Sequence, residues 1–207
     1  MANDYIPGID VSHHNGTIEW SKVKDAGIVF AFAKATEGIG VVDTQFEANY
    51  AAMQKFQILR GAYHFFRPSL DAQAQATSFV KVVPRIGKRD LPAALDVEVS
   101  DGQPPKTIVS GIRKWLDSVE AALGRRPIIY TSATLWNSNL GASKAFGKYR
   151  LWVAHYTNKS APNLPAGFED YAFWQYSESG AVAGITGNVD MDRFKGTRQD
   201  LGRLAGS

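Results

Sequence analysis

Four carboxylate residues stand in or directly after segments expected to be strands: Asp10, Asp96, Glu98 and Asp190. Asp96 and Glu98 are two positions apart in an otherwise apolar segment, so on a strand both side chains project from the same face. Burying two acids without a use for them destabilises a protein, which favours a functional role for this pair. For an isolated aspartate such as Asp10 or Asp190, capping a helix or binding a surface cation is the competing interpretation.

Neighbouring carboxylates are suited to the hydrolysis of glycosidic bonds. One acid must stay protonated to donate to the leaving oxygen, while another stays ionised and stabilises the positive charge that develops at the anomeric carbon. Crowding pushes the pKa values of neighbouring acids apart, which separates these two roles. The pattern therefore predicts a glycoside hydrolase site.

Aromatic residues occur near the same strand ends, and their faces are suited to stacking on sugar rings. Polar side chains between them, such as His64, His155 and Asn188, are suited to bonding sugar hydroxyls. Aromatic residues at strand spacing are also typical of a protein core, so each has two possible roles. The candidate substrate contacts are Tyr63, Phe65, Tyr130, Trp152, Tyr156, Trp174 and Gln175.

The adjacent histidines His13 and His14 raise the alternative of a metal-dependent hydrolase, such as a polysaccharide deacetylase using Asp10 and His13. No HExxH spacing supports a metal site, and no GxSxG elbow supports a serine triad. We therefore expect neither a metal nor another cofactor.

Five strand-then-helix units in succession must position these residues. Apolar runs alternate with stretches that repeat apolar residues at helical spacing, which predicts a parallel sheet with helices outside. The predicted strands are 9–11, 28–35, 59–66, 91–99 and 127–131, and the predicted helices are 18–26, 44–57, 72–83, 108–123 and a short one after Ser132.

The pattern changes after residue 149. Segments 151–156, 171–176 and 182–191 resemble strands, and nothing between them has helical periodicity. Eight strands with five helices predict an α/β fold, a TIM-like (β/α)5β3 barrel with its site at the carboxyl ends of the strands. An open doubly wound sheet is the alternative, although no glycine-rich phosphate-binding loop follows the first strand. Residues 199–205 are expected to form a short helix that closes the barrel.

The composition limits the possible partners. The chain has 207 residues, 44% of them hydrophobic and 21% charged, with no cysteine and a net charge of +3, which fits one globular domain. Its charges are too scattered to indicate nucleic acid, and no apolar run has the length needed for membrane insertion. A mild positive charge favours an anionic surface such as a cell wall. Residues 1–7 lack the pattern of a signal peptide.

Eight segments, in order, resemble the glycoside hydrolase family 25 lysozymes, the Chalaropsis-type N-acetylmuramidases. Together they make a resemblance from Gly8 to about Phe194, nearly the whole chain. The segments are 8–12, 32–38, 61–65, Asp96-x-Glu98, 129–132, 151–156, 173–176 and 189–192.

This resemblance implies a single catalytic domain over residues 1–207 that cleaves the β-1,4 bond between N-acetylmuramic acid and N-acetylglucosamine. It implies a retaining reaction with Glu98 as general acid/base and with Asp10, Asp96 and Asp190 completing the acidic cluster. Asp96 either attacks directly or, as we favour, orients the acetamido group of the substrate. We expect Glu98 to have a raised pKa, from neighbouring carboxylates and partial burial.

The expected partner is bacterial peptidoglycan, attacked by a monomer that is extracellular or delivered to the cell wall. A non-catalytic carbohydrate-binding module on a barrel is the competing hypothesis from another class. It would keep the aromatic residues but has no need of the acids, so the intact Asp96-x-Glu98 pair argues against it.

Overall fold

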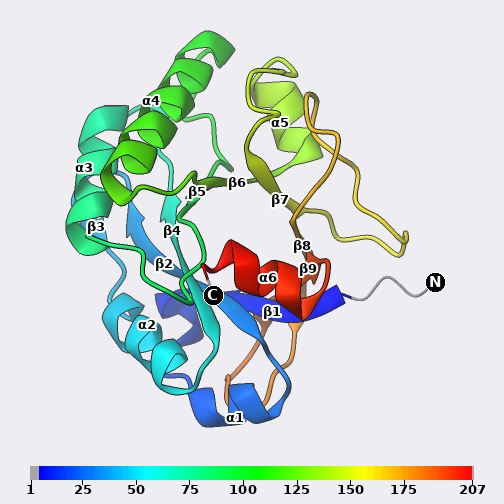
Figure 1. Cartoon of the computed structure of the whole chain (residues 1–207). Coiled ribbons are helices and arrows are strands. Elements are labelled where there is room, and N and C mark those ends of the chain that lie inside the picture. The colour runs from blue at the N-terminus through cyan, green and yellow to red at the C-terminus, as the bar shows by residue number, and fades with distance from the viewer. Residues whose placement is uncertain (1–4, 207) are drawn as a thin grey trace.

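The computed structural model describes residues 5–206, and its strands form a closed barrel with helices on the outside (Figure 1). Around the barrel the order is β1, β2, β4, β5, β6, β7, β8 and β9, and β9 pairs with β1 to close the ring. The strands are β1 (Tyr5–Val11), β2 (Phe30–Glu37), β4 (Leu59–Phe65), β5 (Ala94–Asp96), β6 (Ile128–Ser132), β7 (Arg150–Ala154), β8 (Phe173–Gly180) and β9 (Val189–Lys195), with the short β3 (Val41–Val42) paired to β2 outside the ring. The predicted (β/α)5β3 barrel is confirmed, and the open sheet is excluded.

Helices follow each of the first five barrel strands, as expected. They are α1 (Trp20–Asp25), α2 (Phe46–Lys55), α3 (Ala72–Val82), α4 (Pro105–Leu123) and α5 (Ala133–Asn139), with a short 3-10 helix η1 (His13–Asn15) before α1. Gly124 ends α4 in the left-handed conformation at φ 68°, which glycine adopts without strain. No helix within residues 5–206 is long and apolar enough to cross a membrane.

The last strand differs from the prediction in position. It runs from Val189 to Lys195 rather than over 182–191, and it is antiparallel to both β8 and β1. Residues 181–188 form a short connection with Gly184 and Gly187 at positive φ, and a connection this short returns the chain antiparallel. The fourth strand is also shorter than the predicted 91–99, because only residues 94–96 join the ladder.

Two apolar layers lie on the two faces of the barrel wall. In β2, Phe30 and Phe32 point into the barrel, while Ala31 and Ala33 face the surrounding helices. The ring of Phe32 lies directly against the backbone of Gly61 and leaves no room for a side chain there. A Cβ atom on Gly61 would lie 2.2 Å from this ring. Glycine is therefore required there by close approach.

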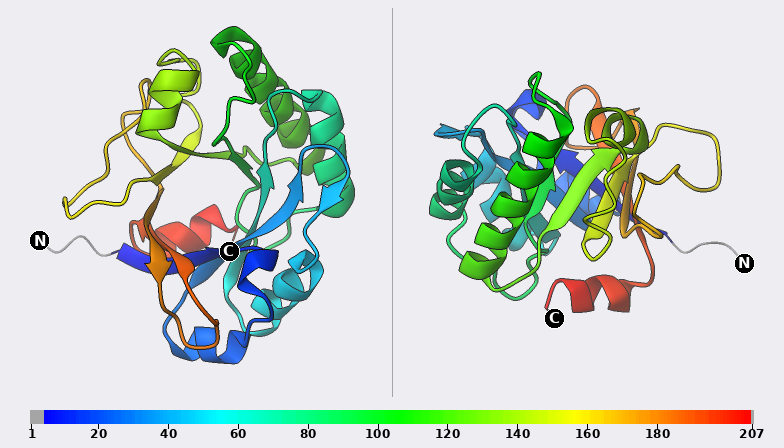
Figure 2. Two further views of the ribbon diagram at one scale, coloured as in Figure 1. Left: turned by 180° about the vertical axis from the view of Figure 1, so that it is seen from behind. Right: turned by 90° about the horizontal axis from the view of Figure 1, so that it is seen from above.

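The helix α6 (Arg198–Leu204) lies across one open end of the barrel, one residue earlier than the predicted 199–205 (Figure 2). Leu201 and Ala205 are buried together with the inward-facing residues of the strands. We call the end covered by α6 the base, and the opposite end the mouth.

Candidate active site

The mouth gathers the four predicted carboxylates, Asp10, Asp96, Glu98 and Asp190, which we call the acidic cluster. Asp10 lies near the end of β1, Asp96 ends β5, and Glu98 follows two residues later. Asp190 was expected at the carboxyl end of its strand, but it reaches the mouth from the other end of a strand. It is the second residue of the antiparallel strand β9, where it pairs in register with Asp10.

Asp96 and Glu98 face each other at different depths. Asp96 is only 4% exposed, and its Oδ1 atom has no hydrogen-bond partner within residues 5–206. The side chain of Glu98 is accessible to solvent, yet protein atoms surround much of its carboxyl group. Burial and the charge of Glu98 raise the pKa of Asp96. Two carboxyls this close share one proton, so that one is an acid while the other is an anion.

The pKa of Glu98 is raised, as predicted, and the main cause is partial burial. We expected the neighbouring carboxylates to raise this pKa as well. That expectation is wrong for Asp96, because hydrogen bonding with Asp96 lowers the pKa of Glu98. The positive charge of Lys34 also lowers the pKa of both carboxyls. Lys34 was not among the predicted site residues. Its Nζ atom lies 2.7 Å from Glu37 Oε2 and 4.9 Å from the ring centroid of Phe65, at the edge of the mouth.

Gln175 holds Asp10 in place. Its Nε2 donates to Asp10 Oδ2 at 2.8 Å, and its Oε1 accepts from the hydroxyls of Tyr130 at 2.8 Å and Tyr156 at 2.7 Å. Gln175 is buried, so protein groups occupy most of its amide. The structure therefore places Gln175 as a support for Asp10 rather than as a free substrate contact.

Asp192 belongs to the same group of acids but was missed as a site residue. It is fully buried two residues after Asp190, and its Oδ1 accepts from Trp152 Nε1 at 2.8 Å. Burial and the neighbouring Asp10 raise its pKa. The sequence did contain a signal, because the spacing of Asp190 and Asp192 repeats that of Asp96 and Glu98.

Most of the predicted aromatic residues line the mouth. Tyr63 stands near all four members of the acidic cluster, whose charges, together with burial, raise its pKa. Trp152 is buried, stacks on Phe32 with ring centroids 4.5 Å apart, and forms the floor beneath the acids. Phe65 is half-buried, whereas Tyr156 is 47% exposed and presents the most accessible ring.

Trp174 does not reach the mouth, contrary to expectation. It lies on the outer face of the barrel with no exposed surface, and the guanidinium carbon of Arg193 is 4.0 Å from its ring centroid. His64 also points outward and bonds Thr36 Oγ1, and burial lowers its pKa to about 4. Both side chains are packing residues of the outer layer.

His13 has a partner other than Asp10. Its Nδ1 lies 2.7 Å from Asp43 Oδ2, and its backbone N–H donates to the same carboxylate oxygen. Residues 5–206 contain no group of three or more histidine, cysteine or acidic side chains that could hold a metal ion. The arrangement does not support a deacetylase built on Asp10 and His13.

The hollows of the molecule differ at the two ends of the barrel. A hollow of about 350 Å³ beside the acidic cluster is lined by Tyr156, Tyr176 and Glu178. A larger cavity of about 1260 Å³ lies at the base, against α6 and the starts of β7 and β8. Neither lining includes a member of the acidic cluster, so the volume of these hollows does not identify the reactive site.

Comparison with known proteins places this geometry in a family. The sequence model of "Glycosyl hydrolases family 25" matches residues 9–185. Lysozyme M1 of Streptomyces globisporus is 40% identical over 213 residues, covering 97% of this chain and 71% of that protein. The N,O-diacetylmuramidase of Chalaropsis sp is 30% identical over 203 residues, covering 89% of this chain and 96% of that protein.

A solved structure shares the whole architecture. The bacterial lysozyme from Streptomyces coelicolor superimposes with a TM-score of 0.93 at 39% identity, covering 98% of this chain and 97% of that one. The barrel, the order of its strands and the matched sequence lead to one conclusion: the protein belongs to glycosyl hydrolases family 25 and is a glycoside hydrolase.

Proposed function

We propose that the protein is a lysozyme that hydrolyses the β-1,4 bond between N-acetylmuramic acid and N-acetylglucosamine in bacterial peptidoglycan. The observation that carries this proposal is the pairing of an accessible Glu98 with a buried Asp96 at the mouth. Two relatives, named lysozyme and N,O-diacetylmuramidase, support the choice of substrate. Residues 1–207 act as one catalytic domain and as a monomer, outside the cell or delivered to the cell wall.

Glu98 is the general acid/base. Its side chain is accessible to the substrate, and partial burial raises its pKa. Before substrate binds, hydrogen bonding within the pair raises the pKa of Asp96 and lowers that of Glu98, so the shared proton moves from Asp96 to Glu98 in the complex with substrate. The proton moves from Glu98 to the glycosidic oxygen as the bond from that oxygen to the anomeric carbon breaks. The resulting carboxylate later removes a proton from the water that completes hydrolysis.

Asp96 assists the substrate's own acetamido group, and the reaction retains the anomeric configuration. The acetamido oxygen forms a bond to the anomeric carbon, giving an oxazolinium-like intermediate whose positive N–H needs an anionic acceptor. The Oδ1 atom of Asp96 supports this role, because it is buried and has no hydrogen-bond partner within residues 5–206. Direct attack by Asp96 on the anomeric carbon is the alternative.

Asp10 and Asp190 supply further negative charge opposite the developing cation. Tyr63, Tyr130 and Tyr156 surround these acids, and the exposed ring of Tyr156 offers a face to a sugar. Trp152 supports the site from below, and Phe65 borders it.

Mass spectrometry of the fragments released from purified peptidoglycan tests the function, with Glu98→Gln compared against wild type. The matched control is Glu169→Gln, an exposed glutamate that lines the base cavity. Fragments with reducing-end N-acetylmuramic acid, absent only for Glu98→Gln, are the expected result. Reducing-end N-acetylglucosamine would identify a glucosaminidase, released acetate a deacetylase, and binding without products a carbohydrate-binding module.

The anomeric configuration of the first product, followed by NMR on a soluble oligosaccharide, tests retention. A β-configured product is expected. Replacing the N-acetyl group of the substrate by a free amine should abolish cleavage if the acetamido group participates, and unchanged cleavage would favour direct attack by Asp96.

A further inference from the structure

Asp192 lies below the acidic cluster and has no direct access to a substrate. In β9 it stands two residues after Asp190, and two residues before Phe194, which points into the barrel. Side chains two apart share a face of a strand, so Asp192 projects into the barrel between these levels. A carboxyl group with no exposed surface at this depth needs an explanation.

The contacts of Asp192 are incomplete for an ionised carboxylate. Its Oδ1 accepts a hydrogen bond from Trp152 Nε1, but its Oδ2 accepts from no donor within residues 5–206. Asp10 and Asp190 are the ionisable groups that face it, and both are acids. An unpartnered charge here would be strongly destabilised, whereas a protonated carboxyl could donate through Oδ2.

Asp10 is placed to receive that proton in a hydrogen bond. Its Oδ2 already accepts from the amide of Gln175. Two tyrosine hydroxyls donate to the oxygen of the same amide, which fixes its NH2 group toward Asp10. Asp10 lies two residues after Gly8, the residue opposite Asp192 in the ladder of β1 and β9, so the two carboxyls are diagonal neighbours. Burial raises the pKa of both carboxyls, but the hydrogen bond between them lowers the pKa of Asp10 and raises that of Asp192, which favours the proton on Asp192.

We propose that Asp192 is a positioning residue that stays protonated at neutral pH and donates a hydrogen bond to Asp10, holding Asp10 as an anion aimed at the mouth. The importance of Asp10 rests on the proposed function, but the protonation of Asp192 does not. Burial and the charge of Asp10 act in the same direction, since both raise the pKa of Asp192. Gln175 and Asp192, which lie opposite each other in the ladder of β8 and β9, then fix the orientation of one catalytic carboxylate.

Infrared spectroscopy with aspartate labelled at its side-chain carboxyl carbon tests the proton directly. The difference spectrum between wild type and Asp192→Asn at neutral pH is expected to contain the C=O band of a protonated acid. The control is Asp25→Asn, an exposed aspartate at the end of α1, whose difference spectrum should contain only ionised carboxylate bands. Loss of an ionised band in Asp192→Asn would overturn the proposal, whether or not the protein cleaves peptidoglycan.

Activity on a soluble peptidoglycan fragment tests the positioning role. Asp192→Ala removes the donor to Asp10 and should lower kcat/KM by about 10- to 100-fold. Asp192→Asn restores a neutral donor and acceptor of the same shape, and it should recover most of that loss. Equal loss in both variants would contradict the proposal, because it would mean that the charge of Asp192 is needed.

Thermal unfolding separates these results from a damaged fold. If Asp192→Ala does not fold, the comparison of Asp192→Asn with wild type still decides, because the proposal requires the asparagine variant to fold and cleave. If wild type itself cleaves no peptidoglycan, the proposed function fails while the infrared result still decides the protonation of Asp192.

Discussion

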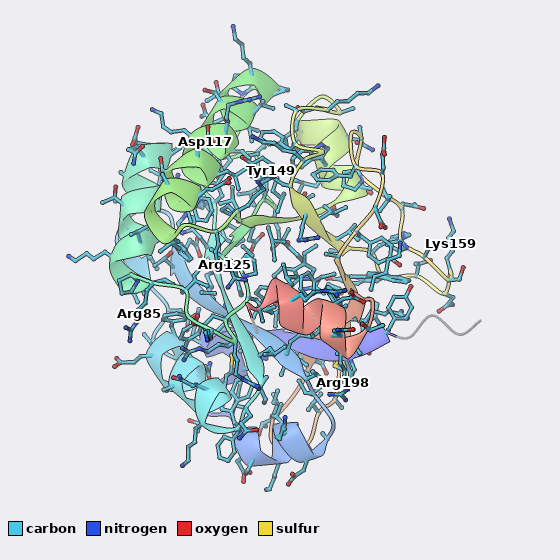
Figure 3. The ribbon with its side chains drawn as sticks, viewed as in Figure 1. Arg85, Asp117, Arg125, Tyr149, Lys159 and Arg198 are labelled. Carbon is cyan, nitrogen blue, oxygen red and sulfur yellow. The ribbon has the colours of Figure 1, made fainter. Side chains whose placement is uncertain are left out.

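Asp10, Asp96 and Asp192 at the mouth of the barrel are buried, and within residues 5–206 none of them forms an ion pair, whereas the charged groups at the base are mostly exposed and paired. At the base, Lys195 Nζ lies 2.6 Å from Asp170 Oδ1, and Arg203 pairs with Asp200. Arg125, beside α6 in Figure 3, donates to the backbone carbonyls of Asp90 and Leu204. At the mouth, Asp96 and Asp192 each keep a buried oxygen that accepts from no donor within residues 5–206.

The difference supports the proposal that the mouth is the functional end of the barrel. Paired surface charges contribute little to stability and need no special role. Buried acids without counter-ions are destabilising, and they raise one another's pKa values into a range that is useful for proton transfer. This contrast is what we expect if the base maintains the fold and the mouth performs the proposed chemistry at the expense of stability.

The sharpest test of this contrast is Glu98→Gln at the mouth against Glu169→Gln at the base. Loss of the proton donor should reduce kcat by about 100- to 10,000-fold, the usual contribution of general acid/base catalysis. Glu169→Gln should leave kcat unchanged. Steady-state kinetics on a soluble fragment measures both, and equal activity in the two variants would remove Glu98 from its proposed role.

Leu201→Ala should lower stability and leave activity unchanged. Leu201 is fully buried where α6 covers the barrel, so its truncation should lower the free energy of unfolding by about 2–5 kcal/mol. Chemical denaturation measures this loss, and kcat/KM at a temperature where the variant remains folded should equal that of wild type. A selective loss of kcat would show that the two ends are coupled.

Gln175→Leu should impair activity more than stability. It removes the donor to Asp10 and leaves the hydroxyls of Tyr130 and Tyr156 without their acceptor. We expect kcat/KM to fall by about 10- to 100-fold. Tyr156→Phe is the matched comparison, because it removes one hydroxyl of the network but keeps the ring; a larger loss there than in Gln175→Leu would contradict this account.

Asp190→Asn should stabilise the protein at alkaline pH while reducing activity. Burial and nearby negative charges raise the pKa of Asp190 from 3.8 to about 6. A raised folded-state pKa destabilises the ionised protein, so the penalty is absent below pH 4 and complete above pH 6. Allowing for its partial exposure, the gain at pH 8 is about 1 kcal/mol, or roughly 2–4 °C in Tm.

Unfolding scans at several pH values provide the check. The stability difference between Asp190→Asn and wild type should vanish near pH 4. A difference that persists at acid pH would have to come from packing rather than from charge.

The alternation of strands and helices was predictable from the sequence because apolar periodicity depends only on local spacing. The pair Asp96 and Glu98 was predictable for the same reason, since residues two apart on a strand share a face. The direction of β9 was not predicted, because the strand was placed over 182–191 and so covered the short connection that returns the chain antiparallel.

Side-chain partners were harder still. Trp174 follows Phe173, and adjacent strand residues face opposite sides, so only one of them could enter the barrel. Which one enters depends on the rings already inside, and Phe30 and Phe32 pack against Phe173. Asp192 was overlooked because its partners, Trp152 and Asp10, lie 40 residues away and at the far end of the chain.

The pairing of β1 with β9, in which Tyr5 lies opposite Lys195, has a consequence for biosynthesis. While the ribosome is still producing residues 189–195, the strands already made leave two unpaired edges, which are sites for association with other nascent chains. Closure joins segments nearly 190 residues apart, so it follows the local strand–helix units in time. A circular permutant that joins the end of the chain to its beginning through a linker and opens an exposed loop elsewhere would make β9 and β1 close in sequence, and would shorten the interval in which those edges are open.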